Sequence, residues 1–188
     1  RRYRATAGRV LNKLTLLPGD GQRLTYLRKI SPYVFEELLL SAFERQGLTV
    51  VRNASYSGDG GLDGQVIIDG EYWLIQAKRY SRAVSPAHVE DFDRLLLQSG
   101  RRGLFIHTGR TGKMSRTLHM ASPRLRIISG QRLLAILAEI SGGSLLLNEL
   151  AGTRADLLAA LFPALAVTRF DAAQIDDHLP ASAIPSVI

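Results

Sequence analysis

Two strand-forming runs separated by a single Asp-Gly pair constrain the fold more than any other feature of this sequence. Residues 65–69 read QVIID and residues 71–78 read EYWLIQAK. Because the Asp-Gly pair at 69–70 favours a tight turn, the two runs predict a β-hairpin. Side chains alternate along a strand, so Gln76 and Lys78 are expected to share one face of this hairpin.

Helix and strand patterns alternate around the hairpin from residue 31 onward. Ser31 and Pro32 begin a helical pattern that ends at Gly47, and Ser85 and Pro86 begin a second one. Strand patterns fall at 48–53, 103–108 and 125–129, and helical patterns at 112–121 and 131–140. The resulting order, α-β-β-β-α-β-α-β-α, predicts an α/β fold with a mixed central sheet flanked by helices.

We divide the chain into three parts. Residues 1–30 are a basic lead-in that we expect to be irregular or partly helical, because "LPGDGQ" interrupts it with a turn signal. Residues 31–141 are the α/β domain. Residues 142–188 are a C-terminal extension of short Leu/Ala-rich helical segments, followed by a Pro-containing tail that we expect to be disordered.

The net charge of +7 is unevenly distributed along the 188 residues. Residues 1–30 carry +7, residues 31–77 carry −5, residues 78–132 carry +9 and residues 133–188 carry −4. The strongly basic stretches favour a polyanionic partner such as DNA, RNA or an anionic membrane surface. A solvated basic face without a partner is the alternative reading of the same pattern.

The start of the chain and its cysteine count bear on where the protein works. The chain has no cysteine, which excludes disulfides and thiolate metal sites and is compatible with an intracellular, cytoplasmic protein. It contains no apolar run long enough to span a bilayer. It begins without methionine, and we interpret it as a fragment. Its first residues, "RRYR", suit a nucleic-acid contact or the cytoplasmic flank of a membrane anchor upstream of Arg1.

The glycine-rich stretch "SGDGGLDGQ" at 57–65 does not match the common binding loops. An EF-hand starting at Asp59 would need oxygen ligands where Gly61 and Gly70 stand. A dinucleotide fingerprint would need glycine at Asp63, and a helix after it. The segment "TGRTGKMS" would be a P-loop only with a glycine five residues before Gly112, where His107 stands. We interpret His107 as a hydrogen-bonded core residue.

Asp63, Gln76 and Lys78 form the remaining constellation. The predicted hairpin brings Asp63, just before its first strand, close to the end of its second strand. A carboxylate and an amide oxygen are ligands that suit Mg²⁺, while Lys78 could orient an attacking water or balance phosphate charge. The alternative is that these three residues are solvated ends of an ordinary hairpin without a catalytic role.

The sequence resembles the catalytic domain of Mrr-type restriction endonucleases, within the PD-(D/E)xK nuclease superfamily, over roughly residues 31–140. The resemblance rests on "SPYVFEELLLSAFERQGLTV", "SGDGGLDGQVIIDGEYWLIQAKRY", "HVEDF" and "GLFIHTGR", in that order. It implies a restriction-endonuclease-like fold with Asp63 as metal ligand, Gln76 in the Q-x-K form of the second motif and Lys78 as catalytic lysine. Glu36 matches the helix glutamate that completes the metal site, and its neighbour Glu37 is the weaker match.

The resemblance also implies an activity and a partner. We expect a Mg²⁺-dependent endonuclease, with Mn²⁺ as a substitute, that cuts double-stranded DNA in restriction or foreign-DNA defence. Cutting two strands with one site per chain favours a homodimer. A Holliday-junction resolvase, a repair nuclease of the same fold and a non-catalytic DNA-binding module remain alternatives. The expected phosphate contacts are Arg79, Arg82, Arg110, Lys113 and Arg116, with Arg101 and Arg102 as further basic residues near the same strands.

Overall fold

The computed structural model describes residues 2–53 and 62–138. The chain divides into two compact units, Arg1–Ala151 and Gly152–Ile188, and all described residues lie in the first. The predicted C-terminal helices and tail, and most of the glycine-rich stretch, lie outside the described residues.

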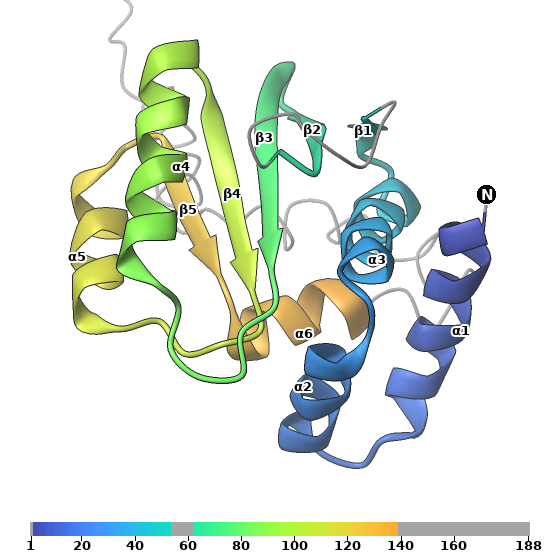
Figure 1. Cartoon of the computed structure of the whole chain (residues 1–188). Coiled ribbons are helices and arrows are strands. Elements are labelled where there is room, and N and C mark those ends of the chain that lie inside the picture. The colour runs from blue at the N-terminus through green and yellow to red at the C-terminus, as the bar shows by residue number, and fades with distance from the viewer. Residues whose placement is uncertain (1, 54–61, 139–188) are drawn as a thin grey trace, which may run out of the picture. The chain divides into compact units, whose positions relative to one another are not determined.

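A five-stranded mixed sheet forms the centre of the first unit, in the order β1-β2-β3-β4-β5 (Figure 1). Its strands β1 to β3 are antiparallel neighbours, whereas β3, β4 and β5 run parallel. The strands are β1 Thr49–Val51, β2 Gly64–Ile68, β3 Glu71–Lys78, β4 Arg102–His107 and β5 Leu125–Ile128. The predicted α/β class, hairpin and parallel crossovers are confirmed.

The β2–β3 hairpin turns at the predicted Asp-Gly pair. Asp69 and Gly70 both have positive φ, 50° and 81°, which is the requirement of a tight type I′ turn. Asp69 is the only non-glycine residue with positive φ among those described. The turn sets a register in which Gly64 lies opposite Ile75, so that the residue before β2 reaches the end of β3.

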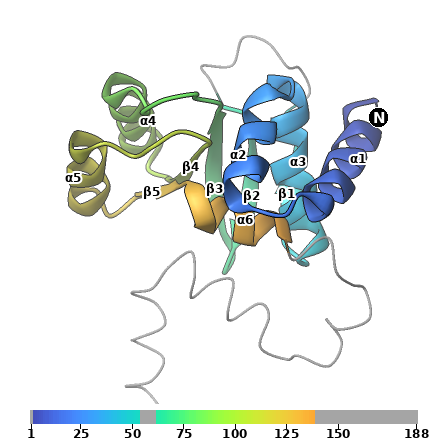
Figure 2. The ribbon, with the colours of Figure 1, turned by 90° about the horizontal axis from the view of Figure 1, so that it is seen from below.

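Helices cover both faces of the sheet. Helix α3 (Pro32–Arg45) contacts β1, β2 and β3, and α6 (Gly130–Ala138) contacts β4. On the other face, α4 (Pro86–Ser99) contacts β4 and α5 (Lys113–Ala121) contacts β5 (Figures 1 and 2). Ser31 caps α3 as predicted, because its side chain accepts a hydrogen bond from Val34 N–H. Helix α4 begins at Pro86 as predicted, but the Ser85 side chain makes no capping hydrogen bond.

The N-terminal lead-in consists of two helices, α1 (Arg2–Leu16) and α2 (Asp20–Lys29). Helix α1 lies beside α3, and α2 contacts α6 (Figure 1). Their apolar residues Val10, Leu11, Leu14 and Leu27 are buried. The lead-in is therefore more regular than predicted, and the "LPGDGQ" segment supplies the turn between its two helices. Among the described residues, no helix is long and apolar enough to cross a membrane.

Candidate active site

Asp63 is held at the end of β3 by two backbone hydrogen bonds. Its N–H donates to the Ile75 carbonyl over 2.9 Å, which extends the hairpin ladder by one residue. Its carboxylate Oδ2 accepts from the Ala77 N–H over 2.6 Å. One carboxylate oxygen is thus fixed against the strand that carries the other predicted site residues, and the hairpin produces the approach that the sequence predicted.

Gln76 and Lys78 occupy alternate positions near the end of β3. Gln76 is buried, with 8% of its surface exposed, and Lys78 is half-buried. Both positions pair in parallel with β4, Gln76 with Phe105 and Lys78 with His107. Among the described residues the Lys78 ammonium makes no hydrogen bond or ion pair, so that it is available for a further charged group.

Glu36 completes an electrostatic cluster from the first turns of α3. Burial and the negative charge of Asp63 raise the pKa of Glu36 to about 7, against the opposing effects of Lys78 and Arg79. Burial also raises the pKa of Asp63 to about 6, although the Ala77 N–H and the Lys78 ammonium favour its charged form. Two carboxyl groups that resist ionisation beside one ammonium are typical of a functional site.

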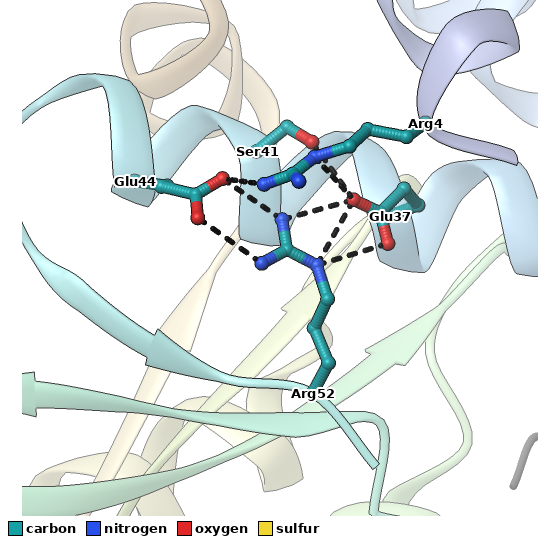
Figure 3. A network of polar contacts seen from close by, with 5 residues as sticks. All are labelled: Arg4, Glu37, Ser41, Glu44 and Arg52. Carbon is teal, nitrogen blue, oxygen red and sulfur yellow. Dashed lines mark hydrogen bonds and ion pairs between the residues drawn. The ribbon is translucent and has the colours of Figure 1, made fainter. Parts of the chain in front are cut away.

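Glu37, the neighbour of Glu36, has a different role. Figure 3 shows its buried carboxylate in a network with Arg4, Ser41, Glu44 and Arg52. Arg52 donates to both Glu37 oxygens over 3.0 to 3.2 Å, and the Ser41 hydroxyl donates over 3.0 Å. These contacts occupy the Glu37 carboxylate within the protein, so Glu36 remains the candidate for a ligand-binding role.

The donor set at this site fits a hard divalent cation. Glu36 and Asp63 offer carboxylate oxygens, and their mutual repulsion would be relieved by a positive charge between them. Gln76 adds an amide group from the adjacent strand position. Within residues 2–53 and 62–138, no three Asp, Glu, His or Cys side chains gather as a metal cluster. A site with two carboxylates suits Mg²⁺, which commonly binds through one or two carboxylates and keeps several waters.

Two arginines tie the lead-in to the strand ends beside the site. Arg28 of α2 donates through Nε and Nη2 to the Thr108 carbonyl, over 3.0 and 2.9 Å. In return, Arg79 donates through Nη1 to the carbonyls of Arg28 and Ile30. We call this reciprocal pair the Arg28–Arg79 clamp. Sequence reasoning missed Arg28, because its partner is 80 residues away and no local pattern marks it.

Thr108, whose carbonyl accepts from Arg28, also hydrogen-bonds to Lys78 and to the segment that follows it. Its N–H donates to the Lys78 carbonyl over 3.3 Å. Its hydroxyl accepts from the Tyr80 N–H over 3.0 Å and donates to the Tyr80 carbonyl over 3.1 Å. Gly109 follows, where a Cβ atom would collide with the Arg82 carbonyl oxygen. The backbone after Lys78 is therefore packed directly against the loop after β4.

The predicted DNA-contacting residues fall into two groups. Arg79 is half-buried and engaged in the clamp, whereas the remaining four are exposed. These four lie in the loops after β3 and β4 and in α5: Arg82, Arg110, Lys113 and Arg116. Their contact with DNA stays a prediction.

Arg101 and Arg102 lie at the opposite end of the parallel strands. Arg102 pairs with Trp73 at the start of the β3–β4 ladder, five positions before Lys78 pairs with His107. Their guanidinium groups lie over the rings of Tyr72 and Trp73, 5.1 and 5.4 Å from the ring centroids. These two arginines lie near the same strands, as expected, but at the end away from Lys78, because β4 begins there.

His107 is a core residue, as predicted. It is fully buried, and burial lowers the pKa of its ring to about 4, so that it is neutral at physiological pH. Its Nε2 hydrogen-bonds with the Thr111 hydroxyl over 3.1 Å.

Comparisons with known proteins bear on the fold and the family of this chain. A solved structure, the MspJI restriction endonuclease in complex with a 27-mer oligonucleotide, matches with a TM-score of 0.51 and 23% identity. The match covers 79% of this chain and 39% of that chain, so this protein spans well under half the length of MspJI. At this identity the likeness shows the fold alone. No match was found among curated proteins.

The family comparison covers the whole of the candidate site. Residues 27–137 match the model of the restriction endonuclease family Mrr_cat. This range begins within α2, ends within α6 and includes Glu36, Asp63, Gln76 and Lys78. Since the match spans more than half of the chain, the protein belongs to the Mrr-type restriction endonuclease family.

Proposed function

We propose that the protein is a Mg²⁺-dependent DNA endonuclease that hydrolyses phosphodiester bonds at the end of β3. The observation that carries the proposal is the placement of Asp63. Its carboxylate is fixed on the Ala77 N–H, between the buried Gln76 and the half-buried Lys78, and it repels Glu36. Membership of a restriction endonuclease family supports the reaction class, and the oligonucleotide bound to MspJI supports DNA as the substrate.

Each residue has a proposed role that follows from its chemistry. Glu36, Asp63 and the Gln76 amide oxygen would hold the cation. A cation held by these residues would supply Lewis-acid chemistry at the scissile phosphate. Lys78 would orient the attacking water and stabilise the negative charge that develops on the phosphate. The Arg28–Arg79 clamp would hold the backbone after Lys78 and so limit its movement.

A cleavage assay with site variants tests this proposal. Wild-type protein is expected to cut plasmid DNA with Mg²⁺ or Mn²⁺ and to be inactive in EDTA. Asp63→Asn and Lys78→Met should each reduce the cleavage rate by about a hundredfold or more, since each removes a group that acts on the transition state. Glu90→Gln, which changes an exposed carboxyl on α4, is the matched control and should cut like wild type.

The choice of DNA separates the remaining alternatives. Preferential cutting of a four-way junction over linear duplex would indicate a junction resolvase of the same fold. Binding of DNA without cutting of any substrate would indicate a DNA-binding module. Full activity of both the Asp63→Asn and Lys78→Met variants would show that the proposed catalytic site is wrong.

A further inference from the structure

A cleft of about 400 Å³ lies between α5, β5 and α6, with both apolar and polar residues in its lining. None of its lining residues is acidic, and two of them, Arg116 and Arg132, are exposed arginines. The remaining lining residues are Thr111, His119, Met120, Ile127, Ser129 and Gln131. We call it the α5–α6 cleft. Two guanidinium groups without a carboxylate beside them favour an anionic ligand.

The arginines of the cleft are not used within the described part of the chain. Across residues 2–53 and 62–138, neither Arg116 nor Arg132 forms a side-chain hydrogen bond or ion pair. By contrast, Arg52 and Arg94 each pair with a carboxylate. The two cleft arginines can therefore donate to a ligand without breaking an existing contact.

Hydrogen bonds hold three polar groups of the cleft lining in place: Thr111, His119 and Ser129. The Thr111 hydroxyl hydrogen-bonds with His107 Nε2 over 3.1 Å and with the Ser129 hydroxyl over 3.0 Å. His119 Nδ1 accepts from the Ile127 N–H over 3.3 Å, so the neutral ring carries its proton on Nε2. Burial, followed by the charges of Arg126 and Arg132, lowers the pKa of His119. The cleft thus combines two cations with neutral hydrogen-bonding groups on a fixed frame.

The cleft also lies at the carboxyl ends of the parallel strands, as the candidate active site does. Thr111 follows β4 and Ser129 follows β5, and both strands run parallel to β3, whose carboxyl end carries Lys78. Figure 2 shows this edge from below, with α6 at the ends of the strands. The exposed Arg110 comes directly before Thr111 along the chain, and the exposed Lys113 lies between Thr111 and Arg116.

We propose that the α5–α6 cleft binds a backbone phosphate of the DNA, away from the phosphate that is cut. Arg116 and Arg132 would donate to the phosphate oxygens, and Gln131 and the hydroxyl groups would complete the contact. This inference rests on the proposed function for its choice of DNA as the source of the phosphate. The cleft would position the duplex across the carboxyl edge of the sheet without reading its sequence.

DNA binding in EDTA tests the cleft independently of cleavage. Arg116→Gln and Arg132→Gln should each weaken the affinity for a short labelled duplex by about tenfold, and lower the slope of log affinity against log salt by about 1. Arg94→Gln is the control, because it removes an exposed arginine of α4 that is paired with Asp91. Equal thermal midpoints should show that all three variants fold.

Three outcomes would decide the matter. Loss of affinity in both cleft variants supports the inference, whether or not wild-type protein cuts DNA with Mg²⁺ in a parallel assay. Wild-type affinity and salt slope in both variants overturn it, even if the protein is an active nuclease. If inorganic phosphate stabilises wild type but not Arg132→Gln, while DNA affinity is unchanged, the cleft binds free phosphate and the DNA assignment is wrong.

Discussion

At the scale of single residues, two adjacent glutamates on α3 have different surroundings. Glu37 is buried and shared among Arg4, Arg52 and Ser41, so its charge is compensated within the protein (Figure 3). Glu36 faces Asp63 and Lys78, and no described residue forms an ion pair with it. The sequence favoured Glu36 over Glu37 through a motif. The physical reason for that preference is the contact of Arg52 with Glu37, which only the structure shows. That reason is non-local, since Arg52 lies 15 residues beyond Glu37.

The raised pKa of Glu36 predicts how metal-free stability depends on pH. The folded state favours the protonated form of the Glu36 carboxyl. This preference stabilises the fold fully below about pH 4.5, and the stabilisation is lost as the pH rises through about 7. Glu36→Gln should therefore be more stable than wild type in EDTA above pH 7, by about 1 kcal/mol once solvent screening is allowed for.

Thermal unfolding across pH 4.5 to 8 measures this difference directly. The advantage of Glu36→Gln over wild type should grow between these limits, whereas the exposed control Glu90→Gln should show no such trend. Saturating Mg²⁺ should remove the advantage, because a bound cation favours the ionised carboxylate. A constant difference between Glu36→Gln and wild type at all pH values would contradict the assignment of Glu36 to the charged cluster.

At the scale of elements, the local patterns predicted most of the fold. The hairpin and both parallel crossovers were predictable because Asp69-Gly70, the strand-forming residues of β3 and the Ser-Pro helix starts are short-range signals. Helices α1 and α2 were less predictable, because their buried faces are narrow and several of their other positions are basic. The pairing of Asp63 with the end of β3 followed from the hairpin alone. The Arg28–Arg79 clamp could not be predicted, since it joins elements far apart in the chain.

The clamp predicts that Arg28 is a positioning residue. Arg28→Ala leaves the buried Thr108 carbonyl without two charged donors, which should lower the free energy of unfolding by about 1.5–3 kcal/mol. Since Thr108 also holds the Lys78 carbonyl, kcat for DNA cleavage should fall while KM changes little.

Two variants control for a general loss of stability. Arg28→Lys keeps the charge and one donor and should recover part of kcat, while Lys29→Ala, at the exposed next position, should behave like wild type. Urea unfolding and single-turnover cleavage report the two effects separately. A variant Arg28→Ala that is destabilised but retains full kcat below its unfolding transition would limit the clamp to a structural role.

At the scale of the whole molecule, the family match and the folded unit do not coincide. The match begins at residue 27, yet α1 packs beside α3 and buries Val10, Leu11 and Leu14 (Figure 1). Arg4 at its start also pairs with Glu44 of α3. Helix α1 therefore belongs to the folded unit and covers part of the helix that carries Glu36.

Helix α1 should therefore stabilise the folded unit. Leu11→Ala, at a position with 1% exposure, should lower the free energy of unfolding by about 2–4 kcal/mol, because it leaves a cavity between α1 and its neighbours. Leu16→Ala, on the same helix but 81% exposed, is the matched control and should change stability by less than about 0.5 kcal/mol. If both variants unfold like wild type in urea, α1 is a separable appendage and residues 27–137 are the folding unit. If only Leu11→Ala is destabilised, the nuclease fold of this protein extends beyond its family core, because α3 needs α1 as a covering layer.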